Sequence, residues 1–177
     1  MGDTVITVIA IALAAVLMFV FPLMTMSDRT DDVSQLTVET ATTEFVDDVR
    51  TTGKLSLDKY SKFVENISST GNSYNVEMEL KVLDENPGKK TAQTAYEKIG
   101  ENVYYTEYTT QIMEDLNDAS NNNTKYLKEG DIVSVSVKNT NTTISQLLRN
   151  FFYRVTGNDS STIGASNGGI VTVNGRN

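Results

Sequence analysis

Residues 5–26 read VITVIAIALAAVLMFVFPLMTM, and this apolar stretch decides how the rest of the chain is organised. As a helix, about 22 residues span about 33 Å, which matches the hydrocarbon thickness of a bilayer. Asp3 precedes the stretch and Asp28 follows it, so no charge falls inside the hydrocarbon, where it would be costly. We therefore predict a permanent membrane helix. The alternatives are a buried core helix and a signal peptide, although the first four residues lack the basic start of a signal peptide.

The rest of the chain is polar and acidic. The sequence has 15 Lys and Arg against 23 Asp and Glu, a formal net charge of −8, and neither Cys nor His. This balance argues against nucleic acid as a partner, because a phosphate-binding face needs clustered basic residues. Arg29 alone is a weak topological signal, and a surface rich in Thr, Ser and Asn suits a solvated exterior. We predict a single-pass protein of the cell membrane whose C-terminal domain is extracytoplasmic.

The composition also argues against an enzyme. Without His and Cys, the commonest general base, the thiol nucleophile and the usual zinc and iron ligands are missing. No glycine motif that cradles phosphate occurs, because Gly164 and the pair Gly168 and Gly169 are not followed by Lys or by the start of a helix. We predict no catalytic residues and no cofactor.

One stretch has the spacing of a calcium-binding loop. Asp118, Ser120, Asn122 and Glu129 fall where a twelve-residue loop places oxygen ligands. The sixth position, which should be Gly, is Asn123, and only two of the four groups are carboxylates. The sequence therefore favours an ordinary polar loop, with calcium as the weaker alternative.

Hydrophobic periodicity predicts an α+β fold behind the membrane helix. Residues 30–52 contain no Gly or Pro and repeat apolar residues at three- and four-residue spacing, which is typical of an amphipathic helix that ends at Gly53. We divide the chain into a membrane helix (1–27), an amphipathic helix continuing from it (28–55) and a polar domain (56–177). The long helix is expected to pack on a small antiparallel sheet with accessory helices, and Pro22 to kink or locally melt it. The other predicted elements are helices at 57–69 (with Ser56 as N-cap), 109–118 and 143–155, strands at 74–82, 101–105, 132–138 and within 168–175, and loops at 117–124 and 157–168.

The predicted helix at 143–155 has two interpretations. Its apolar residues, which include Ile144, Leu147 and Phe151, recur at helical spacing and could pack on the sheet. The same helix carries two Phe and two Arg, a combination that suits the headgroup region of a membrane. The sequence leaves both interpretations open.

The layout resembles that of pilins and pseudopilins of type IV-like machines, and the chain looks like the TadE-like pseudopilins of the tight-adherence branch. The stretches that carry this resemblance are residues 1–4 with the apolar helix, residues 44–55 with Tyr60, and residues 130–137. The resemblance implies a helix that leaves the bilayer to pack into a filament or a priming complex, melting locally near Pro22. Many members carry a Glu early in the helix that pairs with a neighbour's amino group, and only Asp3 could take that part here.

We therefore expect a non-enzymatic surface protein that works as a pilin-like or pseudopilin-like subunit of a filament, secretion or adhesion apparatus. Its partners would be the lipid bilayer and other pilin-like subunits, which the apolar helix from Val5 onward would contact. Small residues such as Ala10 and Ala14 would allow close helix approach, although small residues are also simply tolerated in lipid. The alternative is a monomeric membrane-tethered module that binds a ligand through its Thr- and Asn-rich loops.

Overall fold

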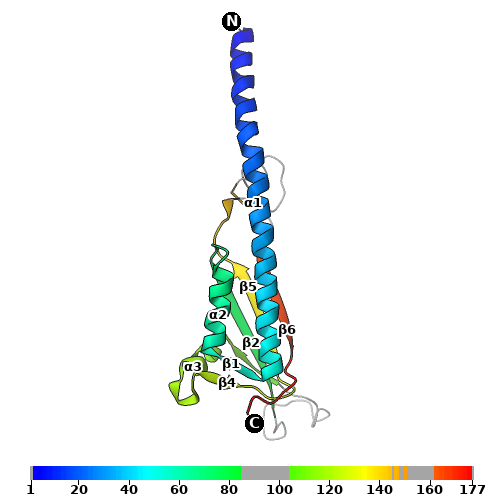
Figure 1. The fold of residues 1–177 in the computed structure, drawn as a ribbon, viewed down its shortest axis with the longest axis vertical. Helices are drawn as coiled ribbons and strands as arrows, with labels where there is room; N and C mark the ends of the chain where they lie inside the picture. The colour runs from blue at the N-terminus through cyan, green and yellow to red at the C-terminus, as the bar shows by residue number, and fades with distance from the viewer. Residues whose placement is uncertain (1, 85–103, 145, 148–149, 151–161, 177) are drawn as a thin grey trace, which may run out of the picture.

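A single helix of 51 residues, α1 (Gly2–Thr52), forms the axis of the molecule in the computed structural model (Figure 1). The structure describes residues 2–84, 104–144, 146–147, 150 and 162–176. The N-terminal half of α1 projects away from the rest of the protein, and the C-terminal half lies along a sheet (Figure 1). The predicted continuity of the apolar and amphipathic helices is thus confirmed.

α1 ends where glycine allows the chain to turn. Gly53 has a φ of +62° and its amide donates to the carbonyl of Val49 at 2.9 Å, which closes the last turn of the helix. A Cβ at position 53 would lie 2.4 Å from the carbonyl oxygen of Val173, so glycine is also required by close packing against the C-terminal segment. The predicted helix stop at Gly53 is confirmed, and its conformation is fixed by a tertiary contact as well as by the turn.

α1 continues through Pro22 without a break. Proline lacks a backbone N–H, so Pro22 removes one hydrogen bond from the interior of the helix. The helix nevertheless continues on both sides of Pro22. Thr25 Oγ1 donates to the carbonyl of Phe21 at 3.0 Å, one of several such contacts from Thr side chains along α1. Local melting at Pro22 is therefore not a feature of this structure.

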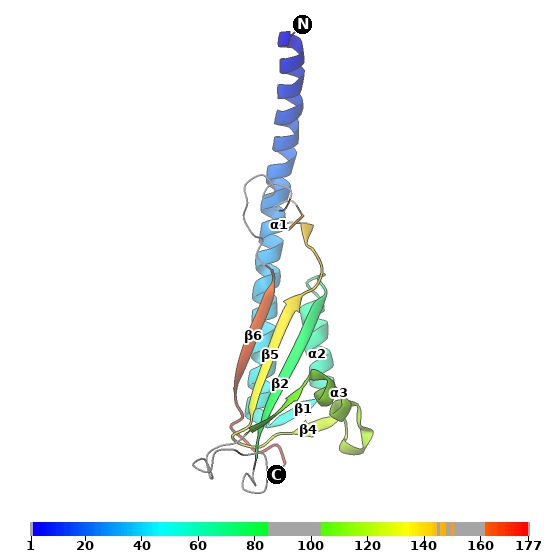
Figure 2. The ribbon, with the colours of Figure 1, turned by 180° about the vertical axis from the view of Figure 1, so that it is seen from behind.

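The main sheet has four antiparallel strands in the order β3-β2-β5-β6 (Figure 2). Strands β2 (Tyr74–Leu83) and β5 (Ile132–Asn139) form its centre and pair from Tyr74 opposite Asn139 to Lys81 opposite Ile132. In β5, Val133, Val135 and Val137 are buried, which is the one-sided burial that the alternating sequence predicts. Both predicted central strands are confirmed.

The smaller elements lie at the end of the molecule distant from the N-terminus (Figure 1). Helix α2 (Leu57–Ser68) begins after Ser56, whose side chain accepts a hydrogen bond from the amide of Lys59, as the N-cap prediction requires. Helix α3 (Thr109–Asn117) confirms the third predicted helix. Strand β1 (Lys54–Ser56) pairs with β4 (Thr124–Tyr126), and these two short strands have no pattern of their own in the sequence.

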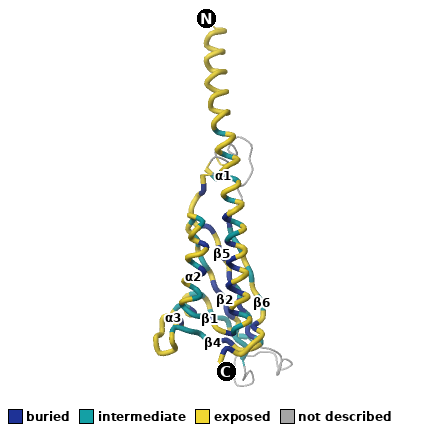
Figure 3. Tube along the Cα trace, in the orientation of Figure 1, coloured by how far each residue is buried: buried dark blue, intermediate teal, exposed yellow. Residues whose placement is uncertain are grey.

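The core lies between the inner face of the sheet, α2 and the C-terminal half of α1 (Figure 3). Phe45 of α1 stacks on Phe63 of α2, with ring centroids 4.6 Å apart and an angle of 11° between the planes. The α1 side of this core is a stripe at three- and four-residue spacing, as the amphipathic pattern predicts. Its members are Val38, Ala41, Thr42, Phe45, Val46 and Val49.

The last strand is where the predictions were wrong. Strand β6 (Gly164–Ile170) occupies part of the predicted loop at 157–168, and the chain has left the sheet over most of the predicted strand within 168–175. Small residues with low strand propensity make up β6, and long-range pairing with β5 imposes the extended conformation on them. A Cβ at Gly168 would lie 2.9 Å from the carbonyl oxygen of Val133, so the lack of a side chain there serves close packing.

Two other predictions need adjustment. Strand β3 (Tyr104–Tyr108) extends three residues beyond the predicted strand at 101–105, whose first three residues lie outside the described part of the chain. The predicted loop at 117–124 is mostly exposed, but it contains a 3₁₀ turn, η3 (Ala119–Asn121), and leads into β4. Local propensity could not reveal β4, because its pairing partner is about 70 residues away in the sequence.

Of the predicted helix at 143–155, residues 143, 144, 146, 147 and 150 are described, and all of these except Thr143, which precedes the first helical residue, are helical. Ile144 and Leu147 are 67% and 58% exposed, so the interpretation that these two residues pack on the sheet is wrong. The remaining apolar residues of this segment, including Phe151, lie outside the described residues.

Candidate membrane and assembly site

In the described part of the chain, the N-terminal half of α1 is an apolar surface without a buried residue (Figure 3). The helix is long and apolar enough to cross a membrane, and none of its apolar window is buried. Ile9, Leu13 and Phe19 are 60%, 60% and 70% exposed. A core helix would bury these side chains, so their exposure disfavours that alternative and leaves a membrane or other protein chains as the apolar environment.

The residues predicted to act in assembly fall on two sides of α1. Spacings of four, three and four residues place Asp3, Thr7, Ala10 and Ala14 on one face of the helix. Asp3 lies in the first turn, where its carbonyl accepts a hydrogen bond from Thr7 Oγ1 at 2.7 Å. Ala10 and Ala14 are exposed and form a pair of small residues separated by three positions, which permits close approach of a second helix.

The other small or special residues point elsewhere. Ala12 and Ala15 lie on the opposite side of α1 from Ala10 and Ala14, at about 100° of rotation per residue. Val5, which is 58% exposed, and Pro22 also lie away from the Ala10 and Ala14 face. One partner helix therefore cannot contact all four alanines at once, and the face with Asp3, Ala10 and Ala14 is the one that combines an acidic group with small residues.

The C-terminal half of α1 is fastened to strand β6 along its length. Asn167 Nδ2 donates to Thr43 Oγ1 at 2.9 Å, and Arg50 Nε donates to the carbonyl of Ile170 at 3.0 Å. The carbonyl of Arg50 in turn accepts from the amide of Thr172 at 3.0 Å. Together with core packing, these bonds join the C-terminal half of α1 to the sheet.

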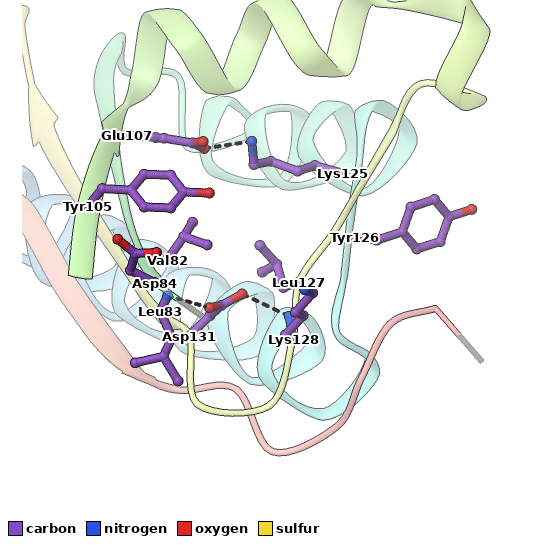
Figure 4. Close-up of a pocket in the computed structure, with 10 residues that line it drawn as sticks. All are labelled: Val82, Leu83, Asp84, Tyr105, Glu107, Lys125, Tyr126, Leu127, Lys128 and Asp131. Atoms are coloured by element: carbon purple, nitrogen blue, oxygen red, sulfur yellow. Dashed lines mark hydrogen bonds and ion pairs between the residues drawn. The ribbon is translucent and has the colours of Figure 1, made fainter. Parts of the chain in front are cut away.

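A cavity of about 350 Å³ opens beside β3 and β4 (Figure 4). Asp131 lies on its wall and is 2% exposed, with its two carboxylate oxygens accepting from the amides of Leu83 (2.9 Å) and Lys128 (2.8 Å). These bonds tie the end of β2 to the turn before β5. A buried carboxylate whose oxygens each accept a backbone amide holds the two segments of the chain together.

Lys125 connects the two sheets at the other side of this cavity (Figure 4). Its ammonium lies 2.5 Å from Glu107 Oε2 of β3 and also contacts Asp115 Oδ2 of α3. Burial lowers the pKa of Lys125, but hydrogen bonds and charge attraction from Asp115 and Glu107 outweigh it and raise the pKa above its ordinary value. The lysine is therefore held as a cation between two carboxylates, which suits a structural ion pair rather than a general base or a nucleophile.

The stretch Ser56-Leu57-Asp58-Lys59 has the Ser-Xaa-Xaa-Lys spacing of some hydrolases. The Ser56 hydroxyl oxygen is used as the N-cap of α2 and accepts from the amide of Lys59 at 3.3 Å. Lys59 Nζ instead lies 2.7 Å from Asp48 Oδ2 and donates to Thr52 Oγ1 at 2.8 Å. The ammonium is thus paired with a carboxylate on α1, and the spacing reflects helix capping.

The four calcium-loop candidates are placed in two different local structures. Asp118 caps the 3₁₀ turn, with Oδ1 accepting from the amide of Ser120 at 2.9 Å, and hydrogen bonds from Ser120 lower the pKa of Asp118. Asn122 follows in a left-handed conformation, with a φ of 54°. Strand β4 separates these residues from Glu129, whose amide donates to Asn174 Oδ1. Among the residues that the structure describes, no group of three or more acidic side chains is arranged to hold a metal ion.

Sequence reasoning found the apolar helix but not the polar contacts that join the elements of the domain to one another and to α1. Gln35, Lys125 and Asp131 are single polar residues without a motif, and their partners are 129, 10 and 48 positions away. The run of small residues in β6 is a sequence signal for close packing of this strand against its neighbours. In comparisons with known proteins, no family model, curated protein or solved structure matches this chain.

Proposed function

We propose that this chain is a non-enzymatic, single-span surface protein that works as a pilin-like or pseudopilin-like subunit of a type IV or tight-adherence type of filament, secretion or adhesion apparatus. The observation that carries the proposal is the form of α1. None of its apolar window is buried, and it continues without interruption into the half that holds the sheet. Such a helix can exchange a lipid environment for a bundle of like helices while the domain keeps a fixed orientation.

The mechanism rests on packing of α1. Without water, helices associate through close van der Waals contact and interhelical polar contacts, which favours faces with small residues. The face with Ala10 and Ala14 provides the close approach. Asp3 at the end of that face provides a carboxylate that can pair with an amino group of a neighbouring subunit, since an unpaired charge in an apolar bundle would be costly.

Negative-stain microscopy of the purified full-length protein tests this proposal. We expect ordered filaments or discrete helix bundles after detergent is removed. Asp3→Asn should reduce the yield of assemblies, because the variant removes the charge and leaves the apolar surface intact. Monodisperse monomers over a wide range of protein and detergent concentrations would contradict the proposal.

A second candidate, a monomeric membrane-tethered binding module, is favoured by one feature of the domain. A hollow of about 250 Å³ is lined by Asn121, Asn122, Tyr126 and Arg176, among others. Arg176 stands over the ring of Tyr126, with its guanidinium carbon 5.3 Å from the ring centroid. The Asn amides and the guanidinium of Arg176 around this hollow can hydrogen-bond a polar ligand such as a wall sugar. A glycan binding screen that gives no signal, for a protein that assembles, would leave only the first candidate.

A further inference from the structure

We propose that the helical turn after β5 rests in the headgroup region of the bilayer and inserts Ile144 and Leu147 at its hydrocarbon edge. This contact would be a second attachment of the domain to the membrane, beside α1. The inference rests on the proposed function only in that α1 must span the membrane. It does not depend on filament formation.

The start of this turn is fixed to α1. Thr143 Oγ1 donates to Asp31 Oδ2 at 2.8 Å, and Thr143 is 8% exposed. Thr143 also caps the turn: its hydroxyl accepts from the amide of Gln146, and the Gln146 side chain accepts from the amide of Thr143, both at 3.2 Å. This reciprocal pair is a capping box. The position of the turn along α1 is therefore set by a partly buried side-chain hydrogen bond.

That position corresponds to the edge of the apolar stretch. Asp31 follows Met26, the last apolar residue of the stretch, by about five residues, or about 7.5 Å along a helix. The headgroup region on each side of a bilayer is about 5–8 Å thick, from the difference between the total and the hydrocarbon thickness. Ile144 also lines a cavity of about 470 Å³ together with Leu23 and Met26, which belong to the apolar stretch itself. The chain after β5 runs beside α1 toward its projecting half (Figure 1).

Two apolar side chains of the turn are exposed in the structure. Ile144 and Leu147 are 67% and 58% exposed, and a three-residue spacing places them on one face of the turn. The amide of Leu147 donates to the carbonyl of Thr143 at 3.0 Å, which holds this spacing. The sheet's outer face, by contrast, presents polar residues such as Ser136 and Lys138 to solvent. Two exposed aliphatic residues at headgroup depth fit a lipid surface, because insertion removes their apolar area from water.

Tryptophan fluorescence in vesicles tests the placement, because the chain contains no Trp and each variant then reports one position. Ile144→Trp and Leu147→Trp place the reporter on the turn. Phe19→Trp places it in the apolar half of α1, and Ser136→Trp places it on the exposed face of β5. Each full-length variant is reconstituted into phosphatidylcholine vesicles that carry bromine either high or deep on the acyl chains.

We expect Phe19→Trp to be quenched most by deep bromine, both turn variants to be quenched most by shallow bromine, and Ser136→Trp to be unquenched. If Phe19→Trp is quenched but both turn variants match Ser136→Trp, the turn does not touch lipid and the inference is overturned while the membrane span stands. A blue-shifted but unquenched turn reporter would show a protein partner on this face and would also overturn the inference. Without quenching of Phe19→Trp, the span and the inference both fail.

Discussion

Gln35 of α1 and Gly164 of β6 exchange two hydrogen bonds across 129 positions of sequence. Gln35 Nε2 donates to the carbonyl of Gly164 at 2.7 Å, and the amide of Gly164 donates to Gln35 Oε1 at 2.9 Å. Strand β6 is an edge of the sheet, so the amide of Gln35 takes the place of a neighbouring strand at its first residue. This contact joins the long helix to the sheet edge and protects part of that edge from other chains.

Replacing Gln35 should weaken the attachment of β6. We expect Gln35→Leu to lower the free energy of unfolding by about 1–3 kcal/mol, because it removes both hydrogen bonds to Gly164, together with an exposed one to Glu39, and leaves two half-buried backbone groups without these partners. Urea denaturation of the full-length protein in detergent, followed by circular dichroism, measures this change. Thr43→Ala is the matched control, since it removes one exposed hydrogen bond to the same strand and should cost less than about 0.5 kcal/mol. Equal effects of the two variants would show that Gln35 has no special role.

Gly53 and Gly71 both have a positive φ, but only Gly53 is also closely packed. Substitutions at these two positions therefore distinguish the cost of backbone strain from the cost of a steric clash. Gly71 has a φ of +80°, and a Cβ added there would have no neighbouring atom within 4 Å. Gly71→Ala should therefore lower the free energy of unfolding by about 1–2 kcal/mol, from the left-handed conformation alone. At Gly53, with φ +62°, the added Cβ would also meet the backbone of Val173 and Gly175 within 2.5 Å. Gly53→Ala should therefore cost at least about 3 kcal/mol, or displace the C-terminal segment. Thermal melting in detergent distinguishes the two variants, and equal melting temperatures would contradict the packing at Gly53.

The ion pairs of Lys125 make a stability contribution with a defined pH range. Because the pKa of Lys125 is raised in the folded protein, the contribution is complete below the ordinary pKa of 10.5 and is lost as pH rises through the higher folded value. Lys125→Met should destabilise the protein by about 1–3 kcal/mol near neutral pH, because the partly buried Glu107 loses its partner.

Denaturation at several pH values checks the Lys125 prediction. From neutral pH to about pH 9, the difference between the wild type and Lys125→Met should be constant, and it should shrink above pH 10.5. The double variant Lys125→Met with Glu107→Gln should recover part of the lost stability, since it removes the carboxylate charge that Lys125→Met leaves without its partner. A difference that disappears already below pH 9 would rule out this assignment.

The sequence predicts those parts of the fold that bury one face in a regular pattern. The stripe from Val38 to Val49 and the alternating valines of β5 are set by local spacing, and both are found as expected. β6 follows no such pattern, because its glycines allow close packing against β5 and α1 instead of forming an alternating apolar face. β1 and β4 are three residues each, too short for any periodicity.

The candidate membrane site also has one part that the sequence predicts and one part that it does not. The apolar stretch and its length are evident from composition alone. The exposure of Ile144 and Leu147 depends on where Thr143 meets Asp31, a contact between residues 112 positions apart that no local pattern encodes. A sequence can show that a helix at 143–155 is amphipathic, but only the tertiary structure shows which environment its apolar face meets.

Oxidative cross-linking in membranes tests most directly whether α1 acts by packing against other copies of itself. The chain has no Cys, so Cys placed singly at positions 10, 12, 14 and 15 reports each face of the helix without background. The account predicts disulfide-linked dimers from Ala10→Cys and Ala14→Cys, with clearly lower yields from Ala12→Cys and Ala15→Cys. Only monomers at all four positions, from protein shown to be in the membrane fraction, would contradict the account.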